Sequence, residues 1–368
     1  MNFSDIFIDD TKNVKRINSD EYLIKGSISV IDQGKELIAG YASDDVENAC
    51  YDTRIIFGDH TRIFKYIDFP FVCGADGTKV LKIIDPSKIN YKYMYYYLLA
   101  SNIPNTGYNR HFKWVKELSF KPVDINSQMM IVNKLDKINN LIDCRKKEIE
   151  KCDNLIKSQF VEMFGNPLLN IDNSISMTEV CEIIDGDRGN NYPKQSDFYA
   201  DEYCLFLNAK NVTDHGFDFS NNVYITKEKD EQLRKGKLKR GDVILTTRGT
   251  VGNLAFYDKD VIYENIRINS GMVILRMDKE KINERFFIEQ FRFQLDNIKF
   301  KIANGSAQPQ LPISKMNAIK LLLPDIEFQN KFAQIAEQID KQKFVNLKIF
   351  QLLGKKLKKW YNSIIDFC

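Results

Sequence analysis

DVILTTRGTVGNLAFYD, residues 242–258, decides the fold, because the chain contains a second stretch of the same length and design. Residues 52–68 read DTRIIFGDHTRIFKYID, with a turn at the same place between two strand-like runs. The match continues in three further pairs of segments: 77–82 with 271–276, 89–94 with 282–287, and 125–160 with 326–361. The offset between the copies drifts only from about 190 to about 201 residues. A unit of this size that is repeated once predicts a pair of domains with two similar working surfaces.

Length and composition agree with two domains. The chain has 368 residues, 43% of them hydrophobic and 28% charged, which is typical of a globular protein that can bury two cores. No apolar run approaches the length of a membrane span, and the acidic N-terminus MNFSDIFIDD does not resemble a signal peptide. We therefore expect a cytoplasmic protein that does not enter a membrane.

Cysteine and histidine do not predict a metal centre. The 7 cysteines include no Cys-x-x-Cys pair, and an odd number in this context favours reduced structural thiols over disulfides or zinc. The three histidines, at positions 60, 111 and 215, are too scattered along the sequence to form a ligand cluster. We therefore expect no metal.

Charge is distributed unevenly although the net charge is only +3. Residues 341–361 contain lysines and no acid, and local basic sets recur near predicted turns, notably at 234–240 and 110–113. Such sets suit the phosphates of nucleic acid, and they are equally expected on an ordinary solvated surface.

The first β-rich stretch gives way to a long helix. Up to about residue 120, short apolar runs alternate with turn sequences such as Gly74-Ala-Asp-Gly. From Ile125 the spacing becomes helical, and Leu135, Ile142, Ile149 and Ile156 recur every seven residues, as in a coiled coil. We expect this helix to begin with Asn126 or Ser127 as its cap, to end near Phe160, and to be roughly 50 Å long.

A second β-rich stretch, from about 168 to 323, includes a predicted helix over 284–300 and is followed by a second amphipathic helix after Pro324. Two apolar stripes of this length are expected to pack on each other as antiparallel helices related by a pseudo-twofold axis. The residues predicted to pack between the helices are Leu135, Ile138, Ile142, Ile149, Ile156, Phe332, Ile339, Phe350, Leu353 and Leu357.

Motifs for catalysis are missing from the sequence. It contains no phosphate-binding Gly-rich loop, no His-Glu-x-x-His and no Gly-x-Ser-x-Gly. Asn166-Pro-Leu-Leu and Asp85-Pro-Ser-Lys lack the second proline and the aromatic residue that an adenine methyltransferase needs to hold a flipped base. We therefore predict no catalytic residues.

Turns at matching places in the two halves carry hydrogen-bonding side chains. Arg, Asn and Gln pair with base edges in the major groove, whereas Lys, Ser and Thr suit phosphates, and neighbouring glycines allow a close approach. The same polar loops would also serve to join strands in any β-rich protein. The candidate DNA-binding residues are Gln33, Lys35, His60, Thr61, Arg62, Arg110, Arg188, Asn190, Asn191, Lys210, Asn211, Thr246, Thr247, Arg248, Thr250, Ser306 and Gln308.

The order of these segments resembles a known family. GDVILTTRGTVGNLAFYD, INSGMVILR and GSAQPQLPISKMNAIKLLLPDIEFQNKFAQIAEQID are similar to the target-recognition domain and following helix of the specificity subunit of type I restriction-modification systems. In the first half, VIDQGKELIAGY and IIFGDHTRIFKYIDFPFVCGADGTKVLK resemble another subtype of this domain. The first helix opens with PVDINSQ, where the family more usually has Pro-Pro, acidic residues and Glu-Gln.

This resemblance implies an α+β fold in which two β-rich target-recognition domains are separated by two long antiparallel helices that form a coiled coil, with a pseudo-twofold internal duplication. The boundaries implied are 1–122 and 166–324 for the recognition domains, and 123–165 and 325–368 for the spacer helices. Each domain would read half of a bipartite site on double-stranded DNA. The helices would bind two methyltransferase subunits, and restriction motor-nuclease subunits would join for cleavage.

We therefore interpret the chain as a non-catalytic DNA-specificity subunit. No cofactor is expected in this subunit, whereas S-adenosylmethionine is expected in the partner methyltransferase, which would flip an adenine for methylation. Two alternatives remain open at the level of sequence. One is a hydrolytic enzyme with a site built on Asp185, Asp187 and His215, and the other is a two-headed adapter that binds proteins.

Overall fold

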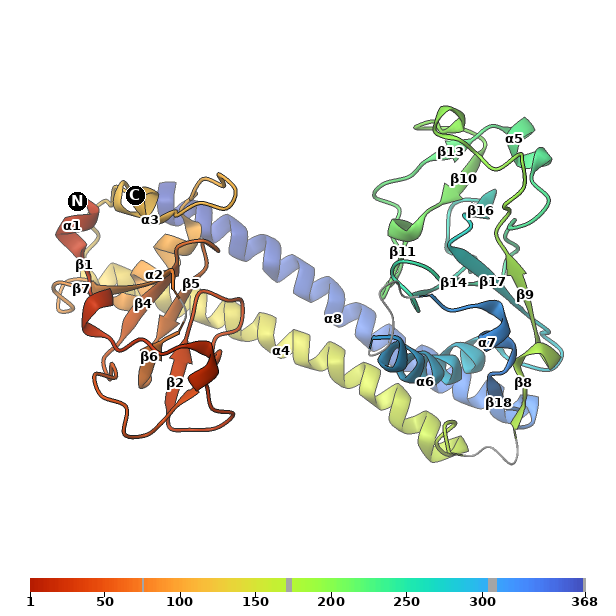
Figure 1. The fold of residues 1–368 in the computed structure, drawn as a ribbon, viewed down its shortest axis with the longest axis horizontal. Helices are drawn as coiled ribbons and strands as arrows, with labels where there is room; N and C mark the ends of the chain where they lie inside the picture. Colours follow the sequence, from red (N-terminus) through yellow and green to blue (C-terminus); the bar gives the residue numbers. More distant parts are fainter. Residues whose placement is uncertain (75, 170–173, 304–309, 367–368) are drawn as a thin grey trace. The chain divides into compact units, whose positions relative to one another are not determined.

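The chain forms two compact units in the computed structural model, which describes residues 1–368 except 75, 170–173, 304–309 and 367–368. The first unit comprises residues Met1–Glu148 and Asn346–Cys368, and the second comprises Ile149–Val345. Each unit contains a β-rich region and a part of both long helices, α4 (Ile125–Phe164) and α8 (Ile326–Asp366) (Figure 1).

The described residues of the first unit form two sheets, three short α-helices and two 3-10 helices, Thr11–Asn13 and Ser19–Glu21, beside the long helices. The larger sheet has the strand order β1-β7-β4-β5, and the smaller sheet has the order β3-β2-β6. Its elements before α4 are α1 (Phe3–Ile6), β1 (Phe7–Asp9), β2 (Ile28–Ile31), β3 (Gly40–Ala42), β4 (Arg54–Gly58), β5 (Phe64–Ile67), β6 (Phe71–Cys73), β7 (Thr78–Ile83), α2 (Tyr91–Ala100) and α3 (Phe112–Lys116).

The second unit repeats this plan with additions. Its larger sheet has the order β15-β14-β17-β9 and its three-stranded sheet the order β13-β10-β16. Two further two-stranded pairs, β11-β12 and β18-β8, complete the described strands. The elements are β8 (Ser174–Ser176), β9 (Cys181–Asp185), β10 (Cys204–Leu207), β11 (Val212–Thr213), β12 (Gly216–Phe217), β13 (Tyr224–Ile225), α5 (Lys227–Gln232), β14 (Val243–Thr246), β15 (Leu254–Phe256), β16 (Ile266–Ile268), β17 (Met272–Met277), α6 (Glu284–Ala303), α7 (Ile313–Asn317) and β18 (Lys320–Leu322).

The two units have the same sheet topology. Strands β1, β7, β4 and β5 correspond to β9, β17, β14 and β15, and every pair in both four-stranded sheets is antiparallel. In the three-stranded sheets, β2 pairs antiparallel with β3 and parallel with β6, just as β10 pairs with β13 and β16. The duplication seen in the sequence is therefore a duplication of strand order and direction.

The ladders correct one detail of the sequence alignment. Ile55 pairs with Leu81 in the first unit, and Val243 pairs with Leu275 in the second. Since Leu81 and Leu275 are equivalent, Ile55 corresponds to Val243, and the alignment of 52–68 with 242–258 is two residues out of register in its first strand. The loop between the paired strands is longer in the second unit and absorbs this difference.

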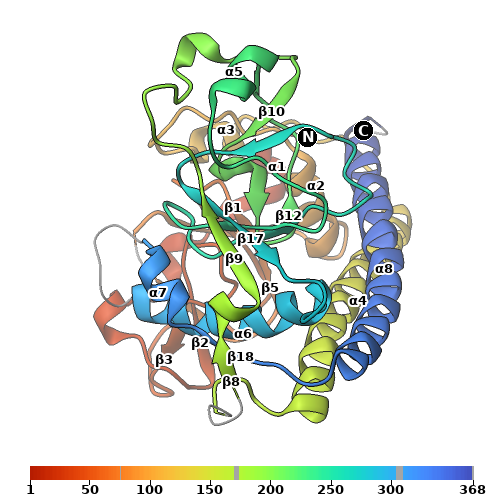
Figure 2. The same cartoon turned by 90° about the vertical axis from the view of Figure 1, so that its right-hand side faces the viewer.

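Each larger sheet is buried on both faces, which explains its continuous apolar runs. In β4, Ile55 and Phe57 pack against a core that includes Tyr93 of α2, whereas Ile56 packs on Ile31 of the smaller sheet. In β14, Val243 and Leu245 face a core that includes helix α6, and Ile244 faces the three-stranded sheet. Helix α6 lies beside β18 (Figures 1 and 2), where the Gln290 side chain exchanges two hydrogen bonds with the backbone of Leu322.

The long helices pack antiparallel, as the sequence predicted. In the first unit, Lys134 of α4 lies over the ring of Trp360 near the end of α8, 5.4 Å from its centroid. In the second unit, Phe160 near the end of α4 packs edge-on against Phe332 near the start of α8, with ring centroids 5.4 Å apart. Together with the two β-rich regions, this arrangement confirms the predicted fold class.

The predicted interhelical residues differ in burial. Leu135, Ile156 and Phe332 are buried, and Ile138, Ile142, Ile149, Ile339, Phe350, Leu353 and Leu357 are half-buried. Helix α4 begins at Ile125 and ends at Phe164, close to the end expected near Phe160 and directly before Gly165. Its capping acceptor is Asp124, whose carboxylate accepts a hydrogen bond from the Ser127 N–H at 3.0 Å, rather than Asn126 or Ser127.

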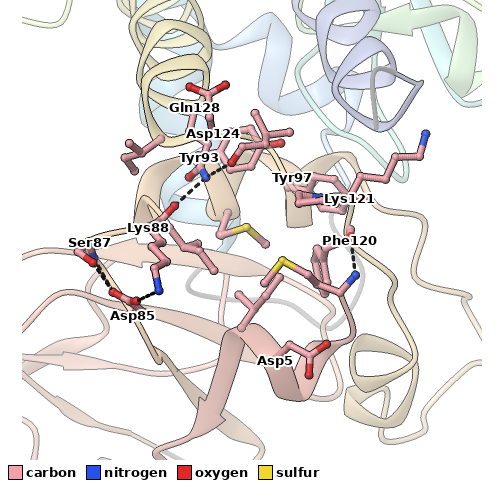
Figure 3. A pocket seen from close by; sticks show the side chains of 17 residues that line it. Asp5, Asp85, Ser87, Lys88, Tyr93, Tyr97, Phe120, Lys121, Asp124 and Gln128 are labelled. Carbon is pink, nitrogen blue, oxygen red and sulfur yellow. Dashed lines mark hydrogen bonds and ion pairs between the residues drawn. The ribbon is translucent and has the colours of Figure 1, made fainter.

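Both long helices begin with a buried glutamine. The amide of Gln128 accepts a hydrogen bond from the Asn90 N–H at 2.8 Å. It also donates to the carbonyls of Lys88 and Val123, and Figure 3 shows Gln128 beside Lys88. The opening PVDINSQ, although divergent, thus keeps the residue that fastens the helix to its β-rich region. No helix among the described residues is long and apolar enough to cross a membrane.

Candidate nucleic-acid interface

Three loops meet at one end of the larger sheet in each unit. In the second unit, the Thr247 N–H donates to the Gly271 carbonyl at 2.8 Å, and the Thr247 carbonyl accepts from the Leu311 N–H at 3.0 Å. In the first unit, the Asp59 N–H donates to Gly77 at 2.7 Å, and the Asp59 carbonyl accepts from the His111 N–H at 2.8 Å. The same backbone junction therefore joins a hairpin, the loop before β7 or β17, and the segment before α3 or α7. We call each set of three loops a loop tip.

Side chains alternate around each junction. Asp59 and His111 point inward in the first unit and are 3% and 0% exposed, and Thr247 and Leu311 are similarly buried in the second. Their neighbours in the sequence lie on the other side of the backbone, where Arg110, Arg248 and Gln310 are exposed and His60 is half-buried. The junction thus presents His60 with Arg110 in one unit, and Arg248 with Gln310 in the other.

Gln33 organises the first loop tip. Its side-chain amide donates to the Asp76 carbonyl at 2.9 Å and accepts from the His60 N–H at 3.2 Å. Its backbone carbonyl accepts from the Thr61 hydroxyl at 2.6 Å. Gly77 has a φ of +87°, and a Cβ there would lie 2.9 Å from Cδ2 of His60. Glycine is therefore required for the loops to close around Gln33.

Two arginines share one carboxylate in the first loop tip. Asp76 accepts from Arg16 at 3.2 Å and from Arg110 at 3.4 Å, and all three side chains are well exposed to solvent. The N–H of Gly77, followed by the two arginines, lowers the pKa of the Asp76 carboxyl group. His60 stacks on Tyr108, with ring centroids 4.9 Å apart. This end of the first unit thus combines cations with an aromatic platform.

The remaining candidates of the first unit lie beside this set. Arg62 adopts a φ of +62° in the hairpin turn, and its guanidinium donates to the Ile103 carbonyl at 3.3 Å. Lys35 is exposed in the loop that follows β2. Lys65, from β5, holds that loop in place by donating to the carbonyls of Asp32 at 2.8 Å and Glu36 at 2.5 Å.

In the second loop tip, Arg188 and Arg248 line one cavity of about 210 Å³ with Asp185, Gln310 and Thr247. Arg188 is held by the Asp185 carboxylate at 3.1 Å and by the Ser270 carbonyl at 3.3 Å. Arg248, by contrast, makes no side-chain hydrogen bond or ion pair to any residue that the structure describes. Of the two arginines that line this cavity, only Arg188 is paired with another described residue.

Some candidates hold the loops together from within. Asn211 is fully buried, and its amide donates to the carbonyls of Asp218 and Asn221 at 3.0 and 3.2 Å. The hydroxyl of Thr246 donates to the Thr250 carbonyl, and that of Thr247 donates to the Gly271 carbonyl at 3.0 Å. These side chains are used inside the protein, which sequence alone did not reveal, and their role is to shape the loops.

The other candidates of the second unit are exposed or undescribed. Asn190, Asn191 and Lys210 are exposed, and the Asn191 amide donates to the Gln232 carbonyl at 3.4 Å. Ser306 and Gln308 lie outside the described residues. Sequence reasoning flagged the loops that contain Asp76, Tyr108 and Gln310 but did not select these three residues, because loop composition gives no information on which side chain faces outward.

Most of the basic side chains described in the set at 234–240 make contacts within the protein. Lys237 donates to Asp230 at 2.5 Å, and Arg240 donates to the Val261 carbonyl at 2.8 Å while it covers the ring of Tyr257. Arg234 remains 78% exposed beside Asp187. These residues therefore add less free positive charge to the surface than their number in the sequence indicates.

The alternative hydrolytic site is not assembled. Burial opposes ionisation of Asp187, but the N–H groups of Gly189 and Arg234 outweigh this and lower the pKa of its carboxyl group. Asp185 is paired with Arg188, whereas the His215 side chain is 92% exposed beside Asp214 in the β11–β12 turn. None of the contacts between described residues joins His215 to either aspartate, and these residues include no group of three or more His, Cys, Asp or Glu suited to a metal ion.

A separate cavity of about 540 Å³ lies where α4 begins (Figure 3). Tyr93, Met94 and Tyr97 of α2 form part of its wall, together with Asp85 and Lys88 from the segment after β7. The loop tip lies at the Thr78 end of β7, whereas this cavity lies beyond its Ile83 end. None of the candidate DNA-binding residues lines it.

The two units thus share one sheet topology, and each presents a loop tip with different side chains. Residues 173–350 match the family model described as the Type I restriction modification DNA specificity domain. These residues therefore belong to the family of type I restriction modification DNA specificity domains.

Individual relatives agree with this assignment. The Type I restriction enzyme EcoR124I/EcoR124II specificity subunit of Escherichia coli is 30% identical over 116 residues, which represent 28% of each chain, so the match spans less than a third of that relative's length. The crystal structure of the type I S subunit from M. genitalium superposes with a TM-score of 0.59 at 15% identity, over 99% of this chain and 95% of that one. A structure of the type I system determined to explain complex assembly and conformational transition gives 0.52 at 13% identity, over 97% and 96%. These structures share the fold.

Proposed function

We propose that this chain is the non-catalytic DNA-specificity subunit of a type I restriction-modification complex, with residues 1–122 and 166–324 as its target-recognition domains. Each domain reads one half of a bipartite site in double-stranded DNA. The observation that carries this proposal is the repeated loop tip, in which one backbone junction presents His60 and Arg110 in the first unit and Arg248 and Gln310 in the second. A common scaffold with different side chains suits two different half-sites.

Contacts to bases and contacts to phosphates have different roles in recognition. Arg, Gln and Asn read base edges, and neighbouring cations contact phosphates and set the register of the protein on the duplex. Thr246, Thr247 and Asn211, which are used internally, hold the loops in shape for these contacts. Preorganised loops lower the conformational entropy lost on binding.

The remaining segments, 123–165 and 325–368, act as spacers. Their helices bind two methyltransferase subunits, which supply S-adenosylmethionine and transfer its methyl group to a flipped adenine. Restriction motor-nuclease subunits join the same complex when DNA is cleaved. This chain supplies binding selectivity and no reacting group.

Methylation mapping of the assembled complex tests the proposal. The full chain, co-purified with its methyltransferase, is incubated with genomic DNA and S-adenosylmethionine, and modified sites are sequenced. A bipartite motif is expected from the complex, and no methylation from the chain alone. Methylation by the isolated chain, or modification without sequence preference by the complex, would contradict the proposal.

Variants of the two hairpins test the division between domains. His60→Ala with Arg62→Ala is expected to alter one half of the motif, and Arg248→Ala with Thr250→Ala the other. Identical changes across the whole motif from both variants would show that the domains do not read separate half-sites.

A further inference from the structure

Arg248 and Gln310 face outward as neighbours from two different loops. The two residues form an isolated antiparallel bridge, and the hydrogen bond from the Leu311 N–H to the Thr247 carbonyl, at 3.0 Å, fixes it. Thr247 and Leu311 are 5% and 3% exposed, so strand alternation directs Arg248 and Gln310 together to the exposed side. Their side chains are therefore held as a pair by backbone atoms.

The spacing of such a pair matches the spacing of bases. Side chains directly opposite one another in an antiparallel bridge have Cβ atoms about 4.5–5.5 Å apart. Successive base pairs in DNA are about 3.4 Å apart along the helix axis. Because both side chains are long enough to converge slightly, the pair is suited to two adjacent base pairs in one major groove, which admits a two-stranded β-ribbon.

Arg248 differs from Arg188 in its ion pairing. Arg188 lines the same cavity but is occupied by Asp185 at 3.1 Å and by the Ser270 carbonyl. Arg248 and Gln310 make no side-chain hydrogen bond to any other described residue. A ligand can therefore use their donors and acceptors without breaking a contact to any of the described residues.

We propose that Arg248 and Gln310 are the specificity-determining pair of the second domain, and that they read a guanine and an adjacent adenine. The guanidinium of arginine donates two hydrogen bonds to O6 and N7 of guanine, and the amide of glutamine pairs with N6 and N7 of adenine. Arg188, held by Asp185, contacts a phosphate beside them. This assignment rests on the proposed function as a DNA-specificity subunit.

The equivalent positions of the first domain carry His60 and Arg110. Arg110 is oriented by Asp76 at 3.4 Å, and His60 is stacked on Tyr108. Because the two pairs differ at both positions, the two half-sites are expected to differ in sequence.

The test measures base preference at single positions. The full chain is assembled with its methyltransferase, and a library of duplexes randomised in both half-sites is sequenced before and after equilibrium binding. Arg248→Gln is expected to lower the preference for one guanine roughly tenfold or more, and Gln310→Ala to do so for the neighbouring adenine. Both variants are expected to leave the base preference in the other half-site unchanged.

Arg292→Gln serves as the control, since it removes the same charge from helix α6 of the same unit, where Arg292 pairs with Glu289. It is expected to leave the selected motif unchanged. Circular dichroism of every variant checks that the fold is retained.

Three results would overturn the inference, and one separates it from the proposed function. Arg248→Gln could weaken all sequences equally and reduce the salt dependence, which is the behaviour of a phosphate contact. The two variants could act on bases that are not adjacent, or leave base preference unchanged. A complex that selects no bipartite site at all would instead contradict the proposed function.

Discussion

Arg145 and Asn346 occupy equivalent positions in the two copies of the repeat, and they hydrogen bond to each other. The guanidinium of Arg145 on α4 donates to the side-chain carbonyl of Asn346 on α8 at 3.1 Å, and also to Glu148 at 2.5 Å. Asn346 is only 2% exposed. A buried polar pair between two helices fixes which residues face each other, as a buried asparagine fixes register in coiled coils.

Removal of one partner is expected to destabilise this helix pair. Asn346→Leu should lower the free energy of unfolding by about 1–3 kcal/mol, because Arg145 keeps Glu148 but loses its acceptor on the other helix. The double variant Arg145→Leu with Asn346→Leu should recover most of this loss, because an apolar pair replaces the polar one. Urea unfolding of the full chain measures both, with Lys146→Leu as an exposed control. A double variant no more stable than the single one would contradict the expected role.

Gln128 and Gln329 provide a second test, because they make the same three hydrogen bonds in their own units. Gln329 accepts from the Asn283 N–H at 2.9 Å and donates to the carbonyls of Lys281 and Pro324 at 3.2 and 2.7 Å. Gln329→Ala leaves these backbone groups without a partner in a buried site, which costs about 1–3 kcal/mol for each group that water does not reach.

Hydrogen exchange followed by mass spectrometry separates the effects of the two glutamines. Gln329→Ala should accelerate exchange around residues 281–286, and Gln128→Ala around the equivalent residues 88–93, with little effect on the other unit. Gln159→Ala, at an exposed contact with Glu162 on α4, is the control. Equal acceleration in both units from either variant would mean that the glutamines do not fasten each helix to its own unit.

The helices could be predicted from sequence more fully than the strand register. Heptad spacing located α4 and an amphipathic stripe located α8, but the burial of Asn346 depends on which residues of the partner helix face it. In β4 and β14, Ile55–Phe57 and Val243–Leu245 are all buried, so the apolar pattern contains no alternation that would fix the alignment. Only the ladder with β7 and β17 revealed the two-residue shift.

The candidate site was predicted at the level of loops rather than side chains. Turn composition identified the segments around residues 60, 110 and 248, but outward orientation depends on the backbone junction at Asp59 and Thr247. Asn211 illustrates the difficulty, since its amide suits a base edge equally well but is turned inward to the carbonyls of Asp218 and Asn221. Whether such a side chain points inward or outward depends on the tertiary contacts of the loop, which the loop sequence alone does not give.

Asp230 predicts how the stability of the second unit depends on pH. Its carboxyl group is 2% exposed and accepts hydrogen bonds from Lys237 and Arg267. Burial alone would raise its pKa, but the two cations outweigh burial, and the pKa lies below the ordinary value of 3.8. A carboxyl group with a lowered pKa in the folded state stabilises the protein above the unfolded pKa, and this contribution is lost as the pH falls through the folded pKa.

Asp230→Asn should therefore cost about 3–5 kcal/mol at neutral pH, because Arg267 stays buried without a counter-charge. The difference in the free energy of unfolding between this variant and the unaltered chain should become smaller as the pH falls below 3.8. Urea midpoints measured from neutral to acidic pH follow this change, with the exposed Asp214→Asn as the control. If the difference in the free energy of unfolding stayed constant with pH, the ionised carboxylate would not be what stabilises the unit.

Lys65 links the core of the first unit to its loop tip. Its ammonium is 4% exposed and holds the loop after β2 through the carbonyls of Asp32 and Glu36, while burial lowers its pKa. The equivalent residue in the second unit is Ala255, so this support is specific to the first domain. Lys65→Met retains the aliphatic volume but removes the donor, so the loop that carries Gln33 and Lys35 should become less ordered.

We expect Lys65→Met to weaken discrimination between bases in the first half-site by roughly tenfold, because the loosened loop must then be ordered on binding. Discrimination in the second half-site should be unchanged. Lys65→Arg, which keeps a donor, should retain part of the discrimination. Binding of duplexes altered in one half-site at a time measures both variants in the assembled complex, and Lys121→Met is the exposed control. If Lys65→Met affected both half-sites equally, a general loss of folding would explain the result, and the unfolding midpoint of the same sample would show it. Normal discrimination with a loosened loop would instead mean that the loop after β2 does not contribute to recognition.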